Sequence, residues 1–445
     1  MKRNVHFGYV AILMAGLCPI VASAQRPSGQ QADRSDSAET QTASVDTTST
    51  TGEQEAPSPQ YVGSLNGSGL IAIDDSGDRH GLMSLTTGGG WDSNPSNTST
   101  ASSAGVYSLS PYLGFKGSAP KSQYIAQYQA TILGYMTDLY ARQTLHRASG
   151  MFVITPSERW KWELNAGGSY GPNGTRLLSA PQSVAVGDIP GTSASSSASY
   201  LNGADNITYV AGSVNASYRR SERDTITASV SNAYSRTSGL NQQGGIASLK
   251  VSYTRDVSQT LGLSGYAQGG RYYGDLQYES YGAGAGIRWQ PRERTYVSLS
   301  MGPQITNCTC NSAHTGVTYS ISFGTRITNK SQMYFLTDHL PTVSFLGPSL
   351  WQRSTSGGFQ YRITPIGVIS ADAGYISSDT LLTAGSYRGM SWGVNYGFHL
   401  RHGIAVSYSY RGYDTDTSGV NTKRNLVQAS ITWTYHEGQI FQTSY

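Results

Sequence analysis

The feature that most constrains this chain is an alternation of apolar and polar side chains that recurs in segment after segment. From about residue 82 onward, apolar residues return at every second position, which is the period of one face of a β-strand. Near the C-terminus, Val427, Ile431 and Trp433 share one face, and Ser430 and Thr432 share the other. Such segments predict strands with one apolar and one polar face.

The connections between these segments are of two kinds that alternate along the chain. Short polar connections lie, for example, at 156–159, 221–224, 291–294 and 401–403. Longer ones lie at 93–104, 171–206, 308–315 and 414–422. Short turns on one rim and longer loops on the other are typical of outer-membrane barrels.

Together these patterns predict an all-β fold, a transmembrane antiparallel up-and-down β-barrel of about 18 strands. Segments 142–154 and 333–340 alternate poorly, so 16 strands is the alternative count. A β-propeller would also repeat at roughly 40 residues, but its strands would be buried on both faces. Only 13% of the residues are charged, whereas a soluble protein carries roughly 25%. The polar faces carry mainly Ser, Gly, Asn and Thr, which suits a water-filled interior.

The sequence divides into four parts. Residues 1–24 are predicted to be a signal peptide, with Lys2 and Arg3 before an apolar stretch and Ala22 and Ala24 at a small-residue cleavage site. Residues 25–80, polar and mainly acidic, predict a disordered periplasmic tether. The barrel is expected at 81–436 and a C-terminal tail at 437–445. Loss of Lys2 and Arg3 takes the formal charge from +4 to +2, which is too little to indicate nucleic-acid binding.

The chain resembles the porin-like outer-membrane β-barrel proteins of Gram-negative bacteria, including barrel porins found near exopolysaccharide genes. The signal sequence, the aromatic strand at 427–435 and two similar turns carry the resemblance. The turns are Ser157-Glu158-Arg159 and Ser221-Glu222-Arg223. The resemblance implies an outer-membrane location, contact with membrane lipids and insertion machinery, and passive diffusion of small hydrophilic solutes. Its alternative is a barrel for exopolysaccharide export or assembly, and a homo-oligomer is left open.

Strand parity places a set of charged residues on the polar face, where we expect them to line the pore. The basic members are Lys116, Lys161, Arg219, Lys250, Arg288, Arg326, Arg362, His399 and Arg411, and the acidic members are Glu163 and Asp372. Several basic members precede a short turn and would form a ring near the periplasmic mouth, which favours anions. In the alternative interpretation, the arginines pair with turn acids such as Glu222 and Glu293, or with lipid headgroups.

No enzyme, metal site or cofactor is expected. Asp338 and His339 form an adjacent acid–histidine pair, expected at the start of a loop, but neighbours on a strand point to opposite faces. Cys308 and Cys310 lack the four-ligand spacing of a structural metal site, which favours a local disulfide or two free thiols. The connection at 171–206 either folds inward as a constriction or remains a surface loop.

Overall fold

A computed structural model describes the part of the chain that forms the barrel. The described ranges are 79–95, 102–137, 140–172, 206–238, 242–275, 278–292, 295–308, 313–328, 330–344, 347–364, 366–380, 386–400, 403–417 and 420–436. The expected signal peptide and C-terminal tail lie outside these ranges, as does the expected tether except for residues 79 and 80, which belong to the first strand. Most of the 171–206 connection, and Cys310, also lie outside them.

The described residues form eighteen strands joined in sequence order. The first nine are β1 (Arg79–Asp92), β2 (Ala104–Ala119), β3 (Ser122–Tyr135), β4 (Gln143–Ser157), β5 (Trp160–Pro172), β6 (Asn206–Arg219), β7 (Asp224–Thr237), β8 (Gln242–Asp256) and β9 (Leu261–Gly274). The second nine are β10 (Tyr278–Arg292), β11 (Thr295–Cys308), β12 (Ala313–Thr328), β13 (Ser331–Ser344), β14 (Gly347–Arg362), β15 (Gly367–Thr380), β16 (Ser386–His399), β17 (Ile404–Thr417) and β18 (Val420–His436).

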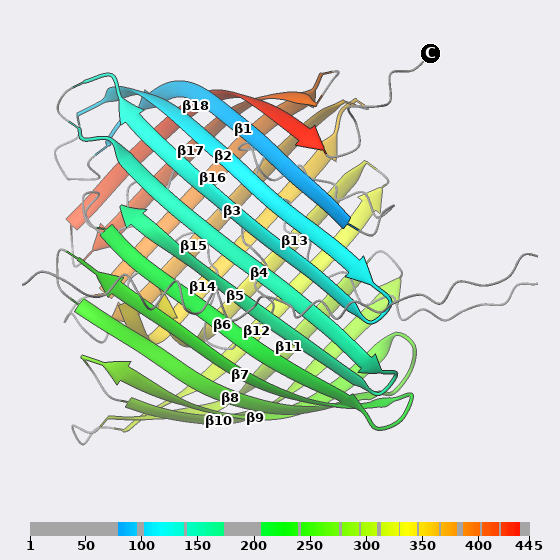
Figure 1. Ribbon diagram of the computed structural model, residues 1–445. Coiled ribbons are helices and arrows are strands. Elements are labelled where there is room, and N and C mark those ends of the chain that lie inside the picture. The colour runs from blue at the N-terminus through cyan, green and yellow to red at the C-terminus, as the bar shows by residue number, and fades with distance from the viewer. Residues whose placement is uncertain are drawn as a thin grey trace, which may run out of the picture. The chain divides into compact units, whose positions relative to one another are not determined.

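Every strand pairs antiparallel with its neighbours in the sequence, and the sheet closes on itself (Figure 1). Closure joins β1 to β18, from Leu82 opposite His436 to Asp92 opposite Leu426. The predicted antiparallel up-and-down barrel is thus confirmed, with 18 strands and not 16. A closed barrel has no edge strand, so each strand can pair its backbone with a neighbour on both sides within a membrane.

The burial of side chains is inverted relative to a soluble protein. Val230 in β7 is 56% exposed, whereas the next residue, Ser231, is 3% exposed. In β18, Ile431 is 52% exposed between Ser430 at 8% and Thr432 at 7%. Apolar side chains therefore face outward and hydroxyl side chains face the lumen, as a barrel in lipid requires.

Three details differ from the sequence-based expectations. The connection expected at 414–422 is mostly strand, because β17 extends to Thr417 and β18 begins at Val420. The poorly alternating segments at 142–154 and 333–340 lie in β4 and β13. Asp338 and His339 lie within β13 and not at the start of a loop, because both pair with β12, opposite Ser320 and Tyr319.

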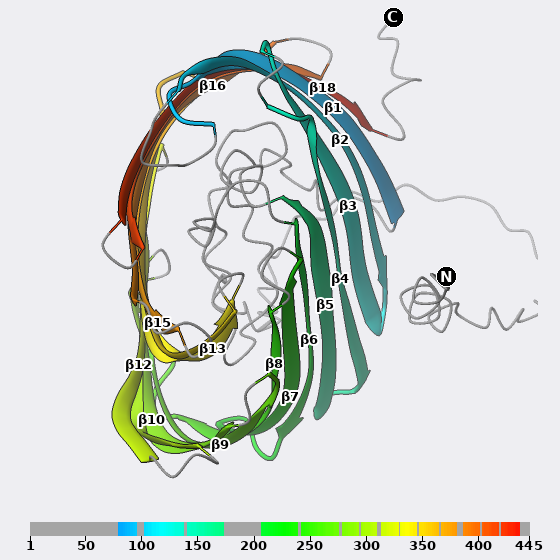
Figure 2. The same ribbon diagram turned by 90° about the vertical axis from the view of Figure 1, so that its left-hand side faces the viewer.

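The lumen of the barrel is divided by two strands that approach the opposite wall. Strands β13 and β14 come within 8 Å of β7 and β8, measured between Cα atoms, although they lie far apart around the ring. Figure 2 shows β13 reaching inward beside β8. This approach separates a small lobe, bounded by β8 to β13, from the larger remainder of the lumen.

Candidate pore lining

The strand registers put the predicted charged residues on the face opposite the exposed apolar side chains. Lys161 and Glu163 alternate with the exposed Trp160 and Trp162 in β5. The residues of the proposed basic ring lie in β2, β6, β10, β12, β14 and β16, within a few residues of the end of each strand. These residues are Lys116, Arg219, Arg288, Arg326, Arg362 and His399. The side chains of Lys116 and His399 lie outside the described part of the structure.

Among the predicted cations, Arg288 and Arg411 have acidic partners in the described structure. These partners are Asp256, at the end of β8, and Asp372, in β15, and not Glu222 or Glu293. Arg288 donates a hydrogen bond to Asp256 across 2.9 Å, with both side chains exposed. Arg411 is buried and lies 3.3 Å from Asp372. Their acidic partners offset part of the positive charge of Arg288 and Arg411. Arg326 and Arg362 are also near the rim and are exposed to solvent.

A buried ion pair at the closing strands was missed by the sequence reasoning. Arg424 in β18 donates from Nε to Oδ1 of Asp92 at 3.0 Å, and from Nη2 to Oδ2 of the same carboxylate. Both side chains are fully buried. Each residue has the parity of the polar face, so parity could have placed them in the lumen. Their pairing links positions 332 residues apart in the sequence, which parity cannot show.

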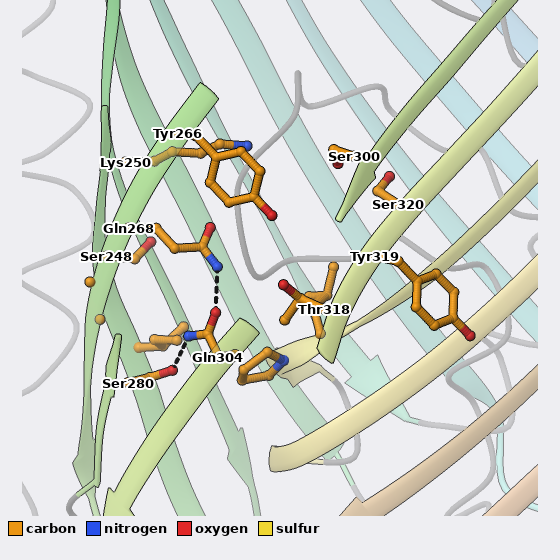
Figure 3. A pocket seen from close by; sticks show the side chains of 15 residues that line it. Ser248, Lys250, Tyr266, Gln268, Ser280, Ser300, Gln304, Thr318, Tyr319 and Ser320 are labelled. Atoms are coloured by element: carbon orange, nitrogen blue, oxygen red, sulfur yellow. Dashed lines mark hydrogen bonds between the residues drawn. The ribbon is translucent and has the colours of Figure 1, made fainter. Parts of the chain in front are cut away.

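The inner face of the small lobe carries a polar pocket with a continuous hydrogen-bond chain. Gln268 Nε2 donates to Gln304 Oε1 at 2.7 Å, and Gln304 Nε2 donates to Ser280 Oγ (Figure 3). Nearby, the ammonium of Lys250 lies 4.7 Å from the ring centroid of Tyr266, as in a cation–π contact. The pocket can therefore offer amide donors, amide acceptors and one cation to a polar group.

Within the described ranges, no group of three or more His, Cys, Asp or Glu side chains could hold a metal ion. Asp338 and His339 point to opposite faces of β13, as their adjacency requires. His339 Nδ1 donates to the backbone oxygen of Val317 at 2.8 Å. No helix in the described residues has the length and hydropathy to cross a membrane.

The closed sheet, its exposed apolar surface and its hydroxyl-lined interior together decide where this chain resides. The protein is an outer-membrane β-barrel. Exposed Trp, Tyr and Phe side chains lie near both ends of the barrel strands, for example Phe359 and Tyr361 at the end of β14 and Tyr281 near the start of β10. Such aromatic girdles are characteristic of barrels of this class.

Comparisons with known proteins found solved structures that are similar at low sequence identity. No family model matches the sequence, and no curated protein matches it. Among solved structures, OccK2 (OpdF) of Pseudomonas aeruginosa is similar with a TM-score of 0.44 and 8% identity, covering 81% of this chain and 98% of that one. OpdK of the same organism is similar with a TM-score of 0.42 and 10% identity, covering 80% of this chain and 99% of that one. OccAB4 of Acinetobacter baumannii is similar with a TM-score of 0.42 and 8% identity, covering 81% of this chain and 99% of that one.

Proposed function

We propose that the barrel is a pore for passive diffusion of small hydrophilic solutes across the outer membrane. The observation that carries the proposal is the polar inner face of a closed sheet of eighteen strands. Barrels of about 16 to 18 strands enclose enough space for an aqueous channel, whereas barrels of about eight strands are filled by side chains. Hydroxyl and amide side chains lining that space can replace part of the hydration shell of a passing solute.

We further propose that the pore prefers anions weakly. Exposed Arg326 and Arg362 lie at or near the same rim, at the ends of β12 and β14. Cations at a constriction raise the local concentration of anions and lower that of cations. The preference is weak because Asp256 and Asp372 offset Arg288 and Arg411.

Planar bilayers test both parts of the proposal. The purified protein should give stepwise conductance, and its reversal potential in a tenfold KCl gradient should have the sign of anion selectivity. The double substitution Arg326→Glu and Arg362→Glu should move that potential toward cation selectivity. Lys423→Glu is the matched control, because Lys423 lies on the outward face of β18 beside Asp414.

A protein that inserts but carries no current would refute the pore. A cation-selective wild type would refute the anion preference alone. Deletion in the native cell separates this function from exopolysaccharide export. Loss of solute uptake with surface polysaccharide intact supports the diffusion pore, and the converse outcome contradicts it.

A further inference from the structure

The junction between β12 and β13 is incomplete over part of its length. β12 pairs with β11 up to Ala313, which lies opposite Asn307. Its pairing with β13 in the described residues stops at Tyr319, opposite His339. Residues 313–318 therefore have a strand partner on one side only, and this gap is called the seam below.

The departure of β13 from the wall has a local cause. Pro341 lacks the N–H that a strand needs for its ladder, and the register with β14 shifts between Leu340 and Thr342. Beyond this point β13 leans toward β7 and β8 across the lumen (Figure 2). The seam is thus the place where the β13–β14 hairpin leaves the cylinder of the other strands.

Side chains close the seam where backbone pairing is missing. The rings of Tyr319 and His339 stack with centroids 5.3 Å apart, and those of His339 and Trp351 stack at 5.2 Å. The Trp351 ring covers Gly316 so closely that a Cβ there would overlap it. His339 Nδ1 also donates to the backbone oxygen of Val317. Opening the seam would break this bond and the ring stacks, but no bond of a β-ladder.

The surroundings of the seam are apolar on the outside. Val317, on the seam itself, is 51% exposed, and Ile305 on the neighbouring β11 is 45% exposed. Such side chains face lipid in this barrel. β12 begins and β13 ends on the rim opposite the start of β1 and the end of β18. Because the segment before β1 is expected to lie in the periplasm, the seam lies in the outer leaflet.

Directly behind the seam lies the polar pocket of the small lobe. It is lined by Tyr319, Leu340 and Pro341, which lie beside the seam, and by Gln268, Gln304 and Lys250 on the opposite side. Its empty volume of about 650 Å³ includes open solvent, so the pocket is a recess in the inner wall and not a closed cavity. The wall is thus apolar beside lipid and polar deeper inside.

We infer that the seam between β12 and β13 is a lateral portal for an amphipathic small molecule. Such a molecule would pass from the outer leaflet into the pocket with its apolar body against Leu340 and Pro341. Its hydrogen-bonding or anionic head would reach Gln268, Gln304 and Lys250. This route runs through the wall and is separate from diffusion along the barrel axis.

Thiol labelling in proteoliposomes tests the portal. Cys308 and Cys310 are first replaced by serine, and Ser300→Cys then places a thiol in the pocket, on the inner face of β11. Ser110→Cys, on the inner face of β2, reports the larger lumen. The probes are N-phenylmaleimide, which dissolves in lipid, and a sulfonated maleimide, which does not. At each position, the labelling rate with N-phenylmaleimide is divided by the rate with the sulfonated maleimide. This ratio should be at least fivefold higher at position 300 than at position 110.

Opening the seam should raise the same ratio further. Trp351→Ala removes one ring of the seal and should speed N-phenylmaleimide labelling at position 300 severalfold, with position 110 unchanged. Tyr319→Ala serves the same purpose if Trp351→Ala does not fold. Tyr234→Ala is the matched control, because Tyr234 is an outward ring stacked on Tyr273 away from the seam.

Two results would overturn the portal. One is an equal reagent ratio at positions 300 and 110, which would mean that the pocket is reached from the lumen. The other is acceleration by Tyr234→Ala as large as that by Trp351→Ala, which would mean that any lost outer ring loosens the wall. Neither result affects the diffusion pore, which the bilayer measurements test separately.

Discussion

The buried pair of Asp92 and Arg424 shows how single residues can fix the closure of the sheet. Two charges without solvent contact are costly to bury, and hydrogen bonds must offset that cost. The two side chains bond each other, and Asp92 also accepts from the backbone N–H of Asn94. The pair joins the first strand to the last, at the end of the barrel opposite the start of β1 and the end of β18. A loss of either partner would leave the other as an unpaired charge at the closing junction.

Arg424→Ala should therefore lower stability by about 3–5 kcal/mol. The readout is the temperature at which the folded band on an unheated gel converts to the unfolded band. The double substitution Asp92→Leu with Arg424→Met removes both charges and should recover most of the loss. A double variant that is less stable than Arg424→Ala would show that the ion pair contributes a net stabilisation, contrary to this reasoning.

At the scale of the element, glycines give outward aromatic rings a place to lie across the neighbouring strand. Gly412 in β17 pairs with Trp392 in β16, and the Trp392 ring lies over it. A Cβ on Gly412 would overlap that ring. Gly265 in β9 is also in a strand, but a Cβ there would meet nothing within 4 Å.

Gly412→Val should thus destabilise the barrel by roughly 1–3 kcal/mol, the usual cost of overpacking. Gly265→Val should be neutral or slightly stabilising, because Val favours strands and Gly does not. Both variants can be compared by urea unfolding followed by tryptophan fluorescence. Equal losses at the two positions would mean that glycine backbone freedom, and not ring packing, decides the effect.

Strand faces could be predicted from the sequence because a side-chain period of two is a local property. Arg219, Arg326 and Arg362 fall on the polar face by counting alone. The seam could not be predicted in this way, because the poor alternation at 333–340 in β13 does not show which other strands this segment approaches. Its formation depends on contact between β13 and β8, far apart along the chain, and Pro341 is the only local sign of it.

The inverted burial of the whole barrel makes a claim about its surroundings that depth-dependent substitutions can test. Val230 is 56% exposed near the middle of β7. Val257 is 48% exposed but lies in the turn after β8. If lipid surrounds the barrel, these two valines of similar exposure lie in different environments. Val230 contacts hydrocarbon, and Val257 lies at the interface with water.

An arginine at position 230 would have to leave water for hydrocarbon, whereas one at position 257 would stay at the interface. Val230→Arg should therefore cost about 2–4 kcal/mol, and Val257→Arg about 0–1 kcal/mol. Urea titrations of the barrel refolded in phospholipid vesicles would measure both. In detergent micelles, which deform around a charge, the difference should shrink. An equal cost at both positions in vesicles would place β7 in water and would contradict a membrane-spanning barrel.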